Sequence, residues 1–304
     1  MSAAPPPPAP RPPQPQPQSR SQPQPQRHAA AEGWLTPRRW SLEEAPPAAD
    51  ALSPQANSGE PPLLLLIDRR QPLSKGCLLQ QAATLSPEER QRHSAYRLAG
   101  DRERFLLARA GLRRLLGAWL DLAPGAVPLE SGYHGKPHCP GGPAFNVSHA
   151  GDLILLALHP ERPVGVDVER LRPDRDWPAI ARRVLLPAEI AAIENLPVAE
   201  RPEGCLAAWC RLEARLKARG DGLAGLERLR QKQVLAPQQQ GEPEPQAGPK
   251  QRSSGSWRGD PASADLPRSG HRASACLRPV PEQLWNVRVP AGYRAAVALA
   301  PPSP

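Results

Sequence analysis

Residues 144–170 read AFNVSHAGDLILLALHPERPVGVDVER, and this stretch contains three segments that favour β-strands. Phe145–Val147 and Leu153–Leu158 flank a polar turn at Ser148–Asp152, and Val164–Val168 alternates between valine and other residues. Short apolar segments that are rich in β-branched residues and bounded by turn formers are typical of strands. We therefore predict three strands in this part of the chain.

Helices and further strands are predicted on both sides of this stretch. Ser86–Glu89 combines an N-cap serine, a proline at the first helical position and two acids, which together indicate a helix start. Further predicted helices are Asp101–Leu120, a segment from Pro187 and Glu203–Arg219, and further predicted strands are Leu63–Ile67, Leu284–Val289 and Tyr293–Leu299. Because strands and helices occur in clusters, we expect an α+β fold and not a parallel doubly wound sheet.

Two segments have compositions that disfavour a packed core. The 304-residue chain contains 43 prolines and only 4% aromatic residues. Residues 1–60 are rich in Pro, Gln and Ala, and residues 231–275 are rich in Gln, Ser, Gly and Arg. Such segments bury too little apolar area to offset the conformational entropy of ordering. We expect a disordered tail at 1–60 and a disordered insertion at about 231–275. We also expect both segments to be dispensable for the folding and activity of the rest of the chain.

Charge and cysteine content narrow the class of protein. The formal net charge of +9 suggests a polyanionic partner such as nucleic acid, a membrane surface or a phosphorylated cofactor. The alternative is that the positive charge only aids solubility. The five cysteines have neither disulfide nor zinc-site spacing. No apolar run approaches the ~18 residues of a membrane span. We expect a soluble, cytoplasmic protein without a membrane partner.

Two acids in the quoted stretch form a candidate metal site. Asp167 and Glu169 are separated by one residue in a predicted strand, so their carboxylates share one face. Two carboxylates so close together repel each other unless a cation lies nearby, and oxygen ligands suit Mg²⁺. The alternative is an exposed strand face with two solvated acids.

A second cluster lies on the predicted helix Glu203–Arg219. Trp209, Glu213 and Lys217 are spaced four residues apart and therefore lie along one stripe. The stripe offers a third carboxylate and a cation for phosphate charge. The alternative is a surface ion pair worth a few tenths of a kcal/mol.

Three motifs in this order resemble the signature of 4′-phosphopantetheinyl transferases. They are Phe145–His149 (FNVSH), Gly165–Glu169 (GVDVE) and Trp209–Lys217 (WCRLEARLK), and the family patterns for the last two are G-(V/I)-D-(V/I)-E and W-x-x-K-E-(A/S)-x-x-K. Leu85–Leu107 is similar to the family's basic N-terminal helices, and Gly135–Pro137 to its G-K-P turn. The matched length resembles the larger, monomeric surfactin-synthetase type.

The resemblance implies both a fold and an activity. The expected fold is two similar α+β halves, residues 61–160 and 161–304, in a pseudo-twofold arrangement with the active site in the cleft between them. The expected reaction transfers the 4′-phosphopantetheine moiety of coenzyme A to a serine of an apo acyl or peptidyl carrier protein and releases 3′,5′-ADP. Fatty-acid, polyketide and nonribosomal-peptide pathways use such carriers.

The resemblance also implies roles for individual residues. Glu213 would help to deprotonate the carrier serine, and Lys217 would assist the departing 3′,5′-ADP. The implied metal ligands for Mg²⁺, or Mn²⁺, are Asp167, Glu169 and Glu213; the implied catalytic residues are Glu213 and Lys217; and the implied coenzyme A contacts are Arg92, Arg104, Lys136, Pro137, Ser148, His149 and Lys217.

Two positions depart from the family pattern. Leu212 stands where the family has lysine, and Glu89 stands where relatives often have a basic residue. We expect the Leu212 side chain to point to the cofactor; the alternative is that it packs within its own helix against Ala208 and Leu216. The lost cation leaves open a catalytically weakened homologue that only binds coenzyme A or a carrier protein. A nucleic-acid-binding or scaffold protein is disfavoured because the arginines are not interleaved with aromatic residues.

Overall fold

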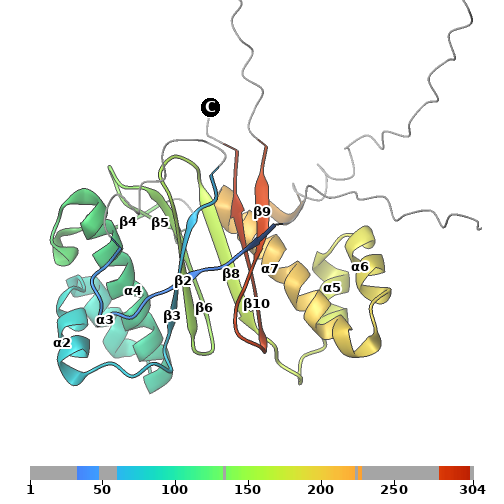
Figure 1. The fold of residues 1–304 in the computed structure, drawn as a ribbon, viewed down its shortest axis with the longest axis horizontal. Coiled ribbons are helices and arrows are strands. Elements are labelled where there is room, and N and C mark those ends of the chain that lie inside the picture. The colour runs from blue at the N-terminus through green and yellow to red at the C-terminus, as the bar shows by residue number, and fades with distance from the viewer. Residues whose placement is uncertain (1–32, 48–59, 133–134, 223–224, 228–280, 302–304) are drawn as a thin grey trace, which may run out of the picture. The chain divides into compact units, whose positions relative to one another are not determined.

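Two four-stranded β-sheets organise the residues that the computed structural model describes, 33–47, 60–132, 135–222, 225–227 and 281–301 (Figure 1). The first sheet has the order β2 (Arg38–Arg39), β3 (Leu63–Asp68), β7 (Leu153–His159) and β6 (Ala144–Ala150). The second has the order β1 (Gly33–Leu35), β9 (Gln283–Val287), β10 (Tyr293–Leu299) and β8 (Val164–Arg170). A separate two-stranded ribbon joins β4 (Glu130–Ser131) and β5 (Pro137–His138). These strands and the helices described next confirm an α+β fold.

Six α-helices in the described residues surround the sheets: α2 (Lys75–Ala83), α3 (Pro87–Ala95), α4 (Ala99–Leu120), α5 (Trp177–Val184), α6 (Pro187–Glu194) and α7 (Arg201–Arg219). The predicted start of α3 is confirmed as a capping box, in which the Ser86 hydroxyl accepts from the Glu89 amide and the Glu89 carboxylate accepts from the Ser86 amide. The helices α2 and α5 were not predicted. None of these helices is long and apolar enough to cross a bilayer.

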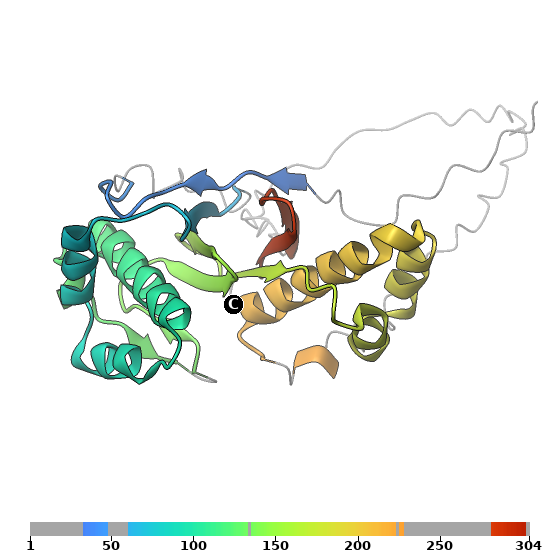
Figure 2. The ribbon, with the colours of Figure 1, turned by 90° about the horizontal axis from the view of Figure 1, so that it is seen from below.

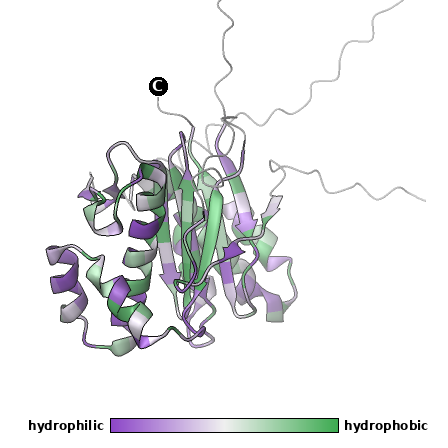
Figure 3. Ribbon diagram, turned by 60° about the vertical axis from the view of Figure 1, so that its left-hand side comes forward, coloured by the Kyte–Doolittle hydropathy of each residue, from purple (hydrophilic) through white to green (hydrophobic). Residues whose placement is uncertain are grey.

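The two long helices cover the sheets in different ways. Leucine side chains of α4, with Phe145 and Leu156 from the first sheet, form a cluster of large buried residues. In contrast, α7 meets the second sheet through small residues, alanines 214 and 218 against alanines 296 and 298. Figure 3 shows the strands as mainly apolar between helices whose outer faces are polar. The small residues let the α7 backbone lie close to β8, which brings its side chains to the strand that carries Asp167.

Gly165 on β8 makes this close approach possible. A Cβ atom built at this position would overlap with the carbonyl oxygen of Ala214 and the backbone nitrogen of Ala218, and would lie 2.8 Å from the carbonyl carbon of Lys217. Only glycine fits between the strand and the helix. The glycine of the GVDVE motif therefore sets the distance between β8 and α7.

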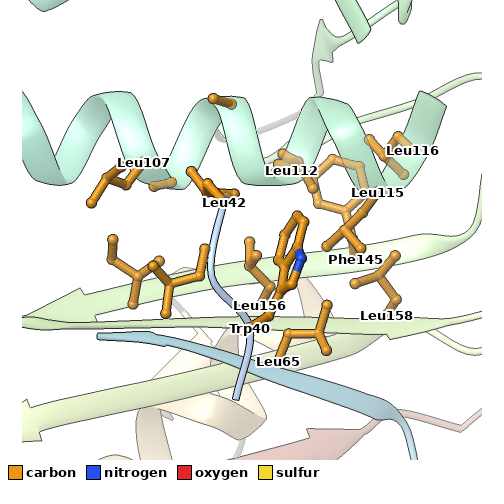
Figure 4. Close-up of a cluster of buried hydrophobic side chains, with 14 of the residues drawn as sticks. Trp40, Leu42, Leu65, Leu107, Leu112, Leu115, Leu116, Phe145, Leu156 and Leu158 are labelled. Atoms are coloured by element: carbon orange, nitrogen blue, oxygen red, sulfur yellow. The ribbon is translucent and has the colours of Figure 1, made fainter. Parts of the chain in front are cut away.

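Residues 33–47 correct the prediction of a disordered tail over 1–60. Strand β1 pairs in parallel with β9 of the second sheet, and β2 pairs in parallel with β3 of the first sheet. Figure 2 shows this segment, in blue, passing from one sheet to the other. Trp40 is 1% exposed and packs between α4 and the first sheet, where it joins the leucine cluster (Figure 4). The proline-rich composition hid a short segment that is held by long-range contacts.

One further boundary differs from the prediction. Strand β6 continues through Ala150, so Ser148 and His149 belong to the strand and the turn is confined to Gly151–Asp152. Every strand of the first sheet precedes residue 160. Every strand of the second sheet except β1 follows it. The predicted insertion at 231–275 lies outside the described residues, as do residues 1–32 and 48–59 of the predicted tail.

Candidate functional site

The centre of the candidate site is a buried carboxylate, Asp167, that is 3% exposed. The ammonium group of Lys217 donates to Asp167 Oδ1 at 2.6 Å, and the hydroxyl of Ser148 donates to the same oxygen at 3.1 Å. Lys217 Nζ also lies 3.4 Å from Ser148 Oγ. Strand β8, strand β6 and helix α7 thus each contribute one side chain. The structure brings together three residues that the sequence analysis assigned to the site.

The second oxygen of Asp167 has no hydrogen-bond partner within the described residues, although it is fully buried. A buried charged oxygen without a partner is costly, so such atoms mark places where a ligand or ion completes the site. Val166 and Val168 belong to the apolar cluster on the opposite face of β8. The prediction that Asp167 and Glu169 project from one strand face is therefore in keeping with the placement of the valines.

Glu169 and Glu213 share this negatively charged environment. Burial raises the pKa of Glu169, and the nearby Asp167 charge raises it further against the opposing effect of Lys217. Burial also raises the pKa of Glu213, which Lys217 lowers and Asp167 raises. Burial and the charges of Asp167 and Glu169 raise the pKa of the Cys210 thiol. A cation at this place would relieve the repulsion between the carboxylates.

The donor chemistry fits a hard cation only in part. The unpartnered Asp167 oxygen and the neighbouring Glu169 are oxygen donors of the kind that Mg²⁺ uses. However, no three His, Cys, Asp or Glu side chains within the described residues are grouped closely enough to hold a metal ion. Mg²⁺ is usually held by one or two carboxylates together with substrate phosphates and water. The arrangement fits that mode, and the role of Glu213 as a third ligand stays a prediction.

A cavity of about 200 Å³ opens beside strand β6. Its wall includes three predicted coenzyme A contacts, Arg92, Pro137 and His149. Desolvation by the surrounding protein lowers the pKa of His149, although its side chain is exposed at the surface, and the charges of Arg104 and Lys217 lower it further. His149 follows Ser148 on β6, so the strand connects the cavity to the Asp167 centre. Its positive surroundings suit an anionic ligand.

Two further predicted cofactor contacts make contacts within the protein. Arg104 donates to the carbonyl oxygen of Gly151 at 2.9 Å and pairs with Asp101. The Lys136 ammonium donates to the carbonyl oxygens of Val164 at 3.2 Å and Lys217 at 2.6 Å, and burial lowers its pKa to about 8. Neither cation points away from the protein toward solvent. Their assignment as cofactor contacts stays a prediction.

The two departures from the family pattern have structural explanations. Leu212 packs against the buried cluster of α5, α6 and α7 that includes Trp177 and Ala208. This packing contradicts the expectation that Leu212 points to the cofactor. It agrees with the packing alternative in so far as the cluster includes Ala208, whereas Leu216 is not part of it. Glu89 accepts from the buried guanidinium of Arg113 at 2.7 Å in addition to closing the capping box. Glu89 thus neutralises the buried charge of Arg113, for which it is the carboxylate partner within the described residues.

Several residues that shape the site were not predicted from the sequence. Arg109 and Phe105 lie one turn apart on α4 and line the cavity, and the guanidinium of Arg109 lies 5.9 Å from the Phe105 ring centroid. Arg92 contacts the same ring from α3 at 5.6 Å. Asn146 lines the cavity from β6. The spacing of Phe105 and Arg109 and the place of Asn146 within FNVSH were the signals available in the sequence.

Comparisons with known proteins agree with this arrangement. A family model described as the N-terminal part of 4′-phosphopantetheinyl transferase matches residues 71–161, and one described as the 4′-phosphopantetheinyl transferase superfamily matches residues 163–270. The chain is 40% identical over 137 residues to the 4′-phosphopantetheinyl transferase AcpT of Salmonella typhimurium, which covers 40% of this chain and 68% of AcpT.

Two further relatives are similar to this chain to a comparable degree. The 4′-phosphopantetheinyl transferase HetI of Nostoc is 37% identical over 153 residues, which is 49% of this chain and 65% of HetI. A putative 4′-phosphopantetheinyl transferase of Synechocystis is 35% identical over 147 residues, which is 47% of this chain and 60% of that protein. The chain thus spans slightly less than two thirds of these two relatives. With the AcpT match and the two adjoining family models, it belongs to the 4′-phosphopantetheinyl transferase superfamily.

Proposed function

We propose that this protein transfers the 4′-phosphopantetheine moiety of coenzyme A to a serine of an apo acyl or peptidyl carrier protein and releases 3′,5′-ADP. The observation that carries the proposal is the Asp167 centre, in which one carboxylate oxygen is bound by Lys217 and Ser148 and the other is buried without a partner in the described residues. Such a site can stabilise charge on a transferring phosphoryl group. The names of the AcpT and HetI relatives support the same activity.

The side chains at the centre divide the chemistry between them. Lys217 neutralises charge that develops on the pyrophosphate and assists the departure of 3′,5′-ADP. Glu213 accepts the proton of the carrier serine, because its raised pKa brings its basicity closer to neutral pH. The serine oxygen then attacks the β-phosphorus atom of coenzyme A, which carries the phosphopantetheine, and the bond from this atom to the bridging oxygen of the ADP portion breaks. Ser148 holds Asp167 in place throughout.

Asp167 and Glu169, with Glu213, would hold Mg²⁺ or Mn²⁺ at this centre. The bound ion supplies positive charge that neutralises the pyrophosphate oxygens. The cavity next to β6 receives the adenosine end of coenzyme A, with Arg92 and His149 toward its phosphates and Pro137 against its base. We also assign Arg104 and Lys136 to coenzyme A binding, although they do not line this cavity. To Arg109, which does line it, we assign a contact that the family pattern does not name.

The partners and setting are part of the same proposal. The carrier protein is a fatty-acid, polyketide or nonribosomal-peptide carrier, the enzyme acts as a monomer in the cytoplasm, and nucleic acid and membrane are not partners. The second candidate is a homologue that binds coenzyme A or the carrier without turnover. Leu212 favours this candidate, because it removes a cation at the motif position that is lysine in the family.

Mass spectrometry distinguishes the two candidates. Apo carrier proteins from the three kinds of pathway are incubated with coenzyme A, Mg²⁺ and the full chain, and the mass gain of phosphopantetheine is measured. We expect modification of at least one carrier, and none with Asp167→Ala, whose folding is checked by thermal unfolding. Absence of modification combined with calorimetric binding of coenzyme A would support the non-catalytic homologue.

A further inference from the structure

Strands β6 and β8 are the neighbouring edges of the two sheets, yet they are not joined by a backbone ladder. Within the described residues, β6 is hydrogen-bonded only to β7, and β8 only to β10, as strand partners. One apolar cluster nevertheless continues from Leu153 and Leu155 of the first sheet to Val166 and Val168 of the second. The two edges therefore meet at a seam that must satisfy its backbone polar groups by other means.

Side chains bind three backbone groups on the seam-facing edge of β8. In a strand, alternate residues direct their backbone groups to the same edge, so Val164, Val166 and Val168 act together. The amide of Val166 donates to Asn146 Oδ1 at 2.8 Å, and the amide of Val168 donates to Ser148 Oγ at 3.3 Å. At the end of the strand, the carbonyl of Val164 accepts from Lys136 at 3.2 Å.

Asn146 and Ser148 are two residues apart on β6 and thus present their side chains in register with two amides of β8. Ser148 also donates to Asp167, so one hydroxyl contacts both the backbone of β8 and its central carboxylate. Asn146 has no such contact with Asp167 in the described structure. Its side chain accepts instead from the amide of Val166, the residue that precedes Asp167. Each bond thus fixes the backbone on one side of Asp167.

We propose that Asn146 is a positioning residue that holds the Val166 amide and thereby fixes β8, and with it the Asp167 carboxylate, relative to β6 and Lys217. The kinetic part of this inference rests on the proposed function, whereas the hydrogen bond does not. If Asn146 is lost, β8 keeps its ladder with β10 and its packing against α7, so the fold persists while Asp167 loses one of its two fixed flanks. A shift of about 1 Å at a reacting group can lower turnover a hundredfold.

The test compares Asn146→Ala with two other variants. Asn146→Asp replaces the amide oxygen that accepts from the Val166 amide by a carboxylate oxygen, which also accepts a hydrogen bond. Asn195→Ala removes an asparagine at the exposed end of α6, away from the site, and serves as the matched control. Amide hydrogen exchange at Val166 is measured by NMR for each, because exchange reports the bond whether or not the protein is an active transferase.

We expect Val166 to exchange about tenfold faster in Asn146→Ala, the loss of one net hydrogen bond, and to stay protected in Asn146→Asp and Asn195→Ala. Turnover of Asn146→Ala should fall ten- to a hundredfold, with a much smaller change in KM for the carrier and at a temperature where the variant is fully folded. Unchanged exchange at Val166, or equally fast exchange in Asn146→Asp, would overturn the bond.

If Val166 exchanges faster in Asn146→Ala as expected but turnover stays at the wild-type rate, the positioning role is overturned and Asn146 is a purely structural residue. If the wild-type chain transfers nothing, the exchange result still stands and the proposed function alone fails. The same exchange measurement is then repeated with coenzyme A and the diamagnetic ion Mg²⁺. Further protection of Val166 in the wild-type chain but not in Asn146→Ala would support the positioning role, and equal protection in both would overturn it.

Discussion

Glu213 combines a proposed chemical role with a cost to stability. Its carboxyl has a raised pKa because burial disfavours its charge. A group with a raised pKa in the folded state adds stability below its unfolded pKa of about 4.3, and this contribution is lost as pH rises through the higher folded value. At neutral pH the ionised side chain is therefore a burden on the fold, although a base must be ionised to work.

Glu213→Gln keeps the shape of the side chain and removes its charge. We expect turnover to fall by about two to four decades, the size of a general-base effect. We also expect its melting temperature at pH 7 to equal or exceed that of the wild type, with the difference shrinking as pH falls toward 4. The activity part is checked by measuring carrier modification by both proteins across pH. The stability part is checked by calorimetric unfolding of both proteins across the same range. A variant that is less stable and fully active would contradict both.

Leu212 illustrates how packing can claim a motif position. Its side chain contacts the buried cluster around Trp177, so Leu212→Lys would place an ammonium against apolar residues unless the chain turns outward. We expect a loss of about 1 kcal/mol, seen as a melting temperature lower by ~2–4 °C, without tighter coenzyme A binding. Leu212→Met, which conserves volume, is the control. Lower KM for coenzyme A with an unchanged melting temperature would restore the cofactor-facing alternative.

At the scale of elements, the contact between β8 and α7 decides where Asp167 and Lys217 meet. The contact is made of alanines and depends on the absence of a side chain at Gly165. Any substituent there must push the helix away from the strand, and Lys217, whose own carbonyl carbon lies beside Gly165, moves with it. Stability and site geometry are thus coupled through one residue.

Gly165→Ala should accordingly affect both properties. Overpacking costs about 1–3 kcal/mol and can cost more where the clash is with backbone atoms. We expect a lower melting temperature and, in the protein that remains folded, turnover reduced at least tenfold. Gly76→Ala is the matched control, because its Cβ would meet only the Ser74 hydroxyl at 3.9 Å and alanine favours the helix α2. Equal behaviour of the two variants would show that α7 can shift freely.

Local sequence patterns account for most of the predicted elements and for the residues at which they begin and end. Capping signals predicted α3, and glycine at a left-handed φ of 72° ends α7 at Gly220. Helix α5, in contrast, begins after Asp176 in a segment that is rich in charged residues and proline. Its buried face is recognised only when Trp177 is seen to pack in a cluster with residues of α7. Short elements that depend on such distant contacts carry little local signal.

The same distinction holds for the candidate site. Asp167, Lys217 and Ser148 were predicted from motifs and do meet. The bonds of Asn146 with Val166 and of Lys136 with Val164 were not predicted, because they join residues 20 and 28 positions apart through side chains. Motif spacing indicates which residue types are present, whereas the direction of each side chain depends on how the two sheets adjoin.

At the scale of the whole molecule, residues 33–47 connect the two sheets. Strand β1 pairs with β9, the Arg288 amide donates to the Leu35 carbonyl at 2.8 Å, and β2 pairs with β3 a few residues later. Trp40 is then buried beneath Arg114, whose guanidinium lies 5.3 Å from the indole centroid and donates to the Leu42 carbonyl. This segment, which the composition assigned to a dispensable tail, is therefore part of the core.

Two truncations separate the composition argument from the contacts. Deletion of residues 1–32 removes proline- and glutamine-rich sequence alone and should leave melting temperature and turnover nearly unchanged. Deletion of residues 1–47 also removes Trp40, and truncation of a buried tryptophan by itself costs about 3–5 kcal/mol. We expect the longer deletion to unfold well below the wild type and to be cleaved rapidly by protease, and Trp40→Ala in the full chain to reproduce much of this loss. Because β1 and β2 contact different sheets, the longer deletion should also broaden or split the unfolding transition measured by calorimetry. A single sharp transition at the wild-type temperature would show that the two sheets hold together without this segment.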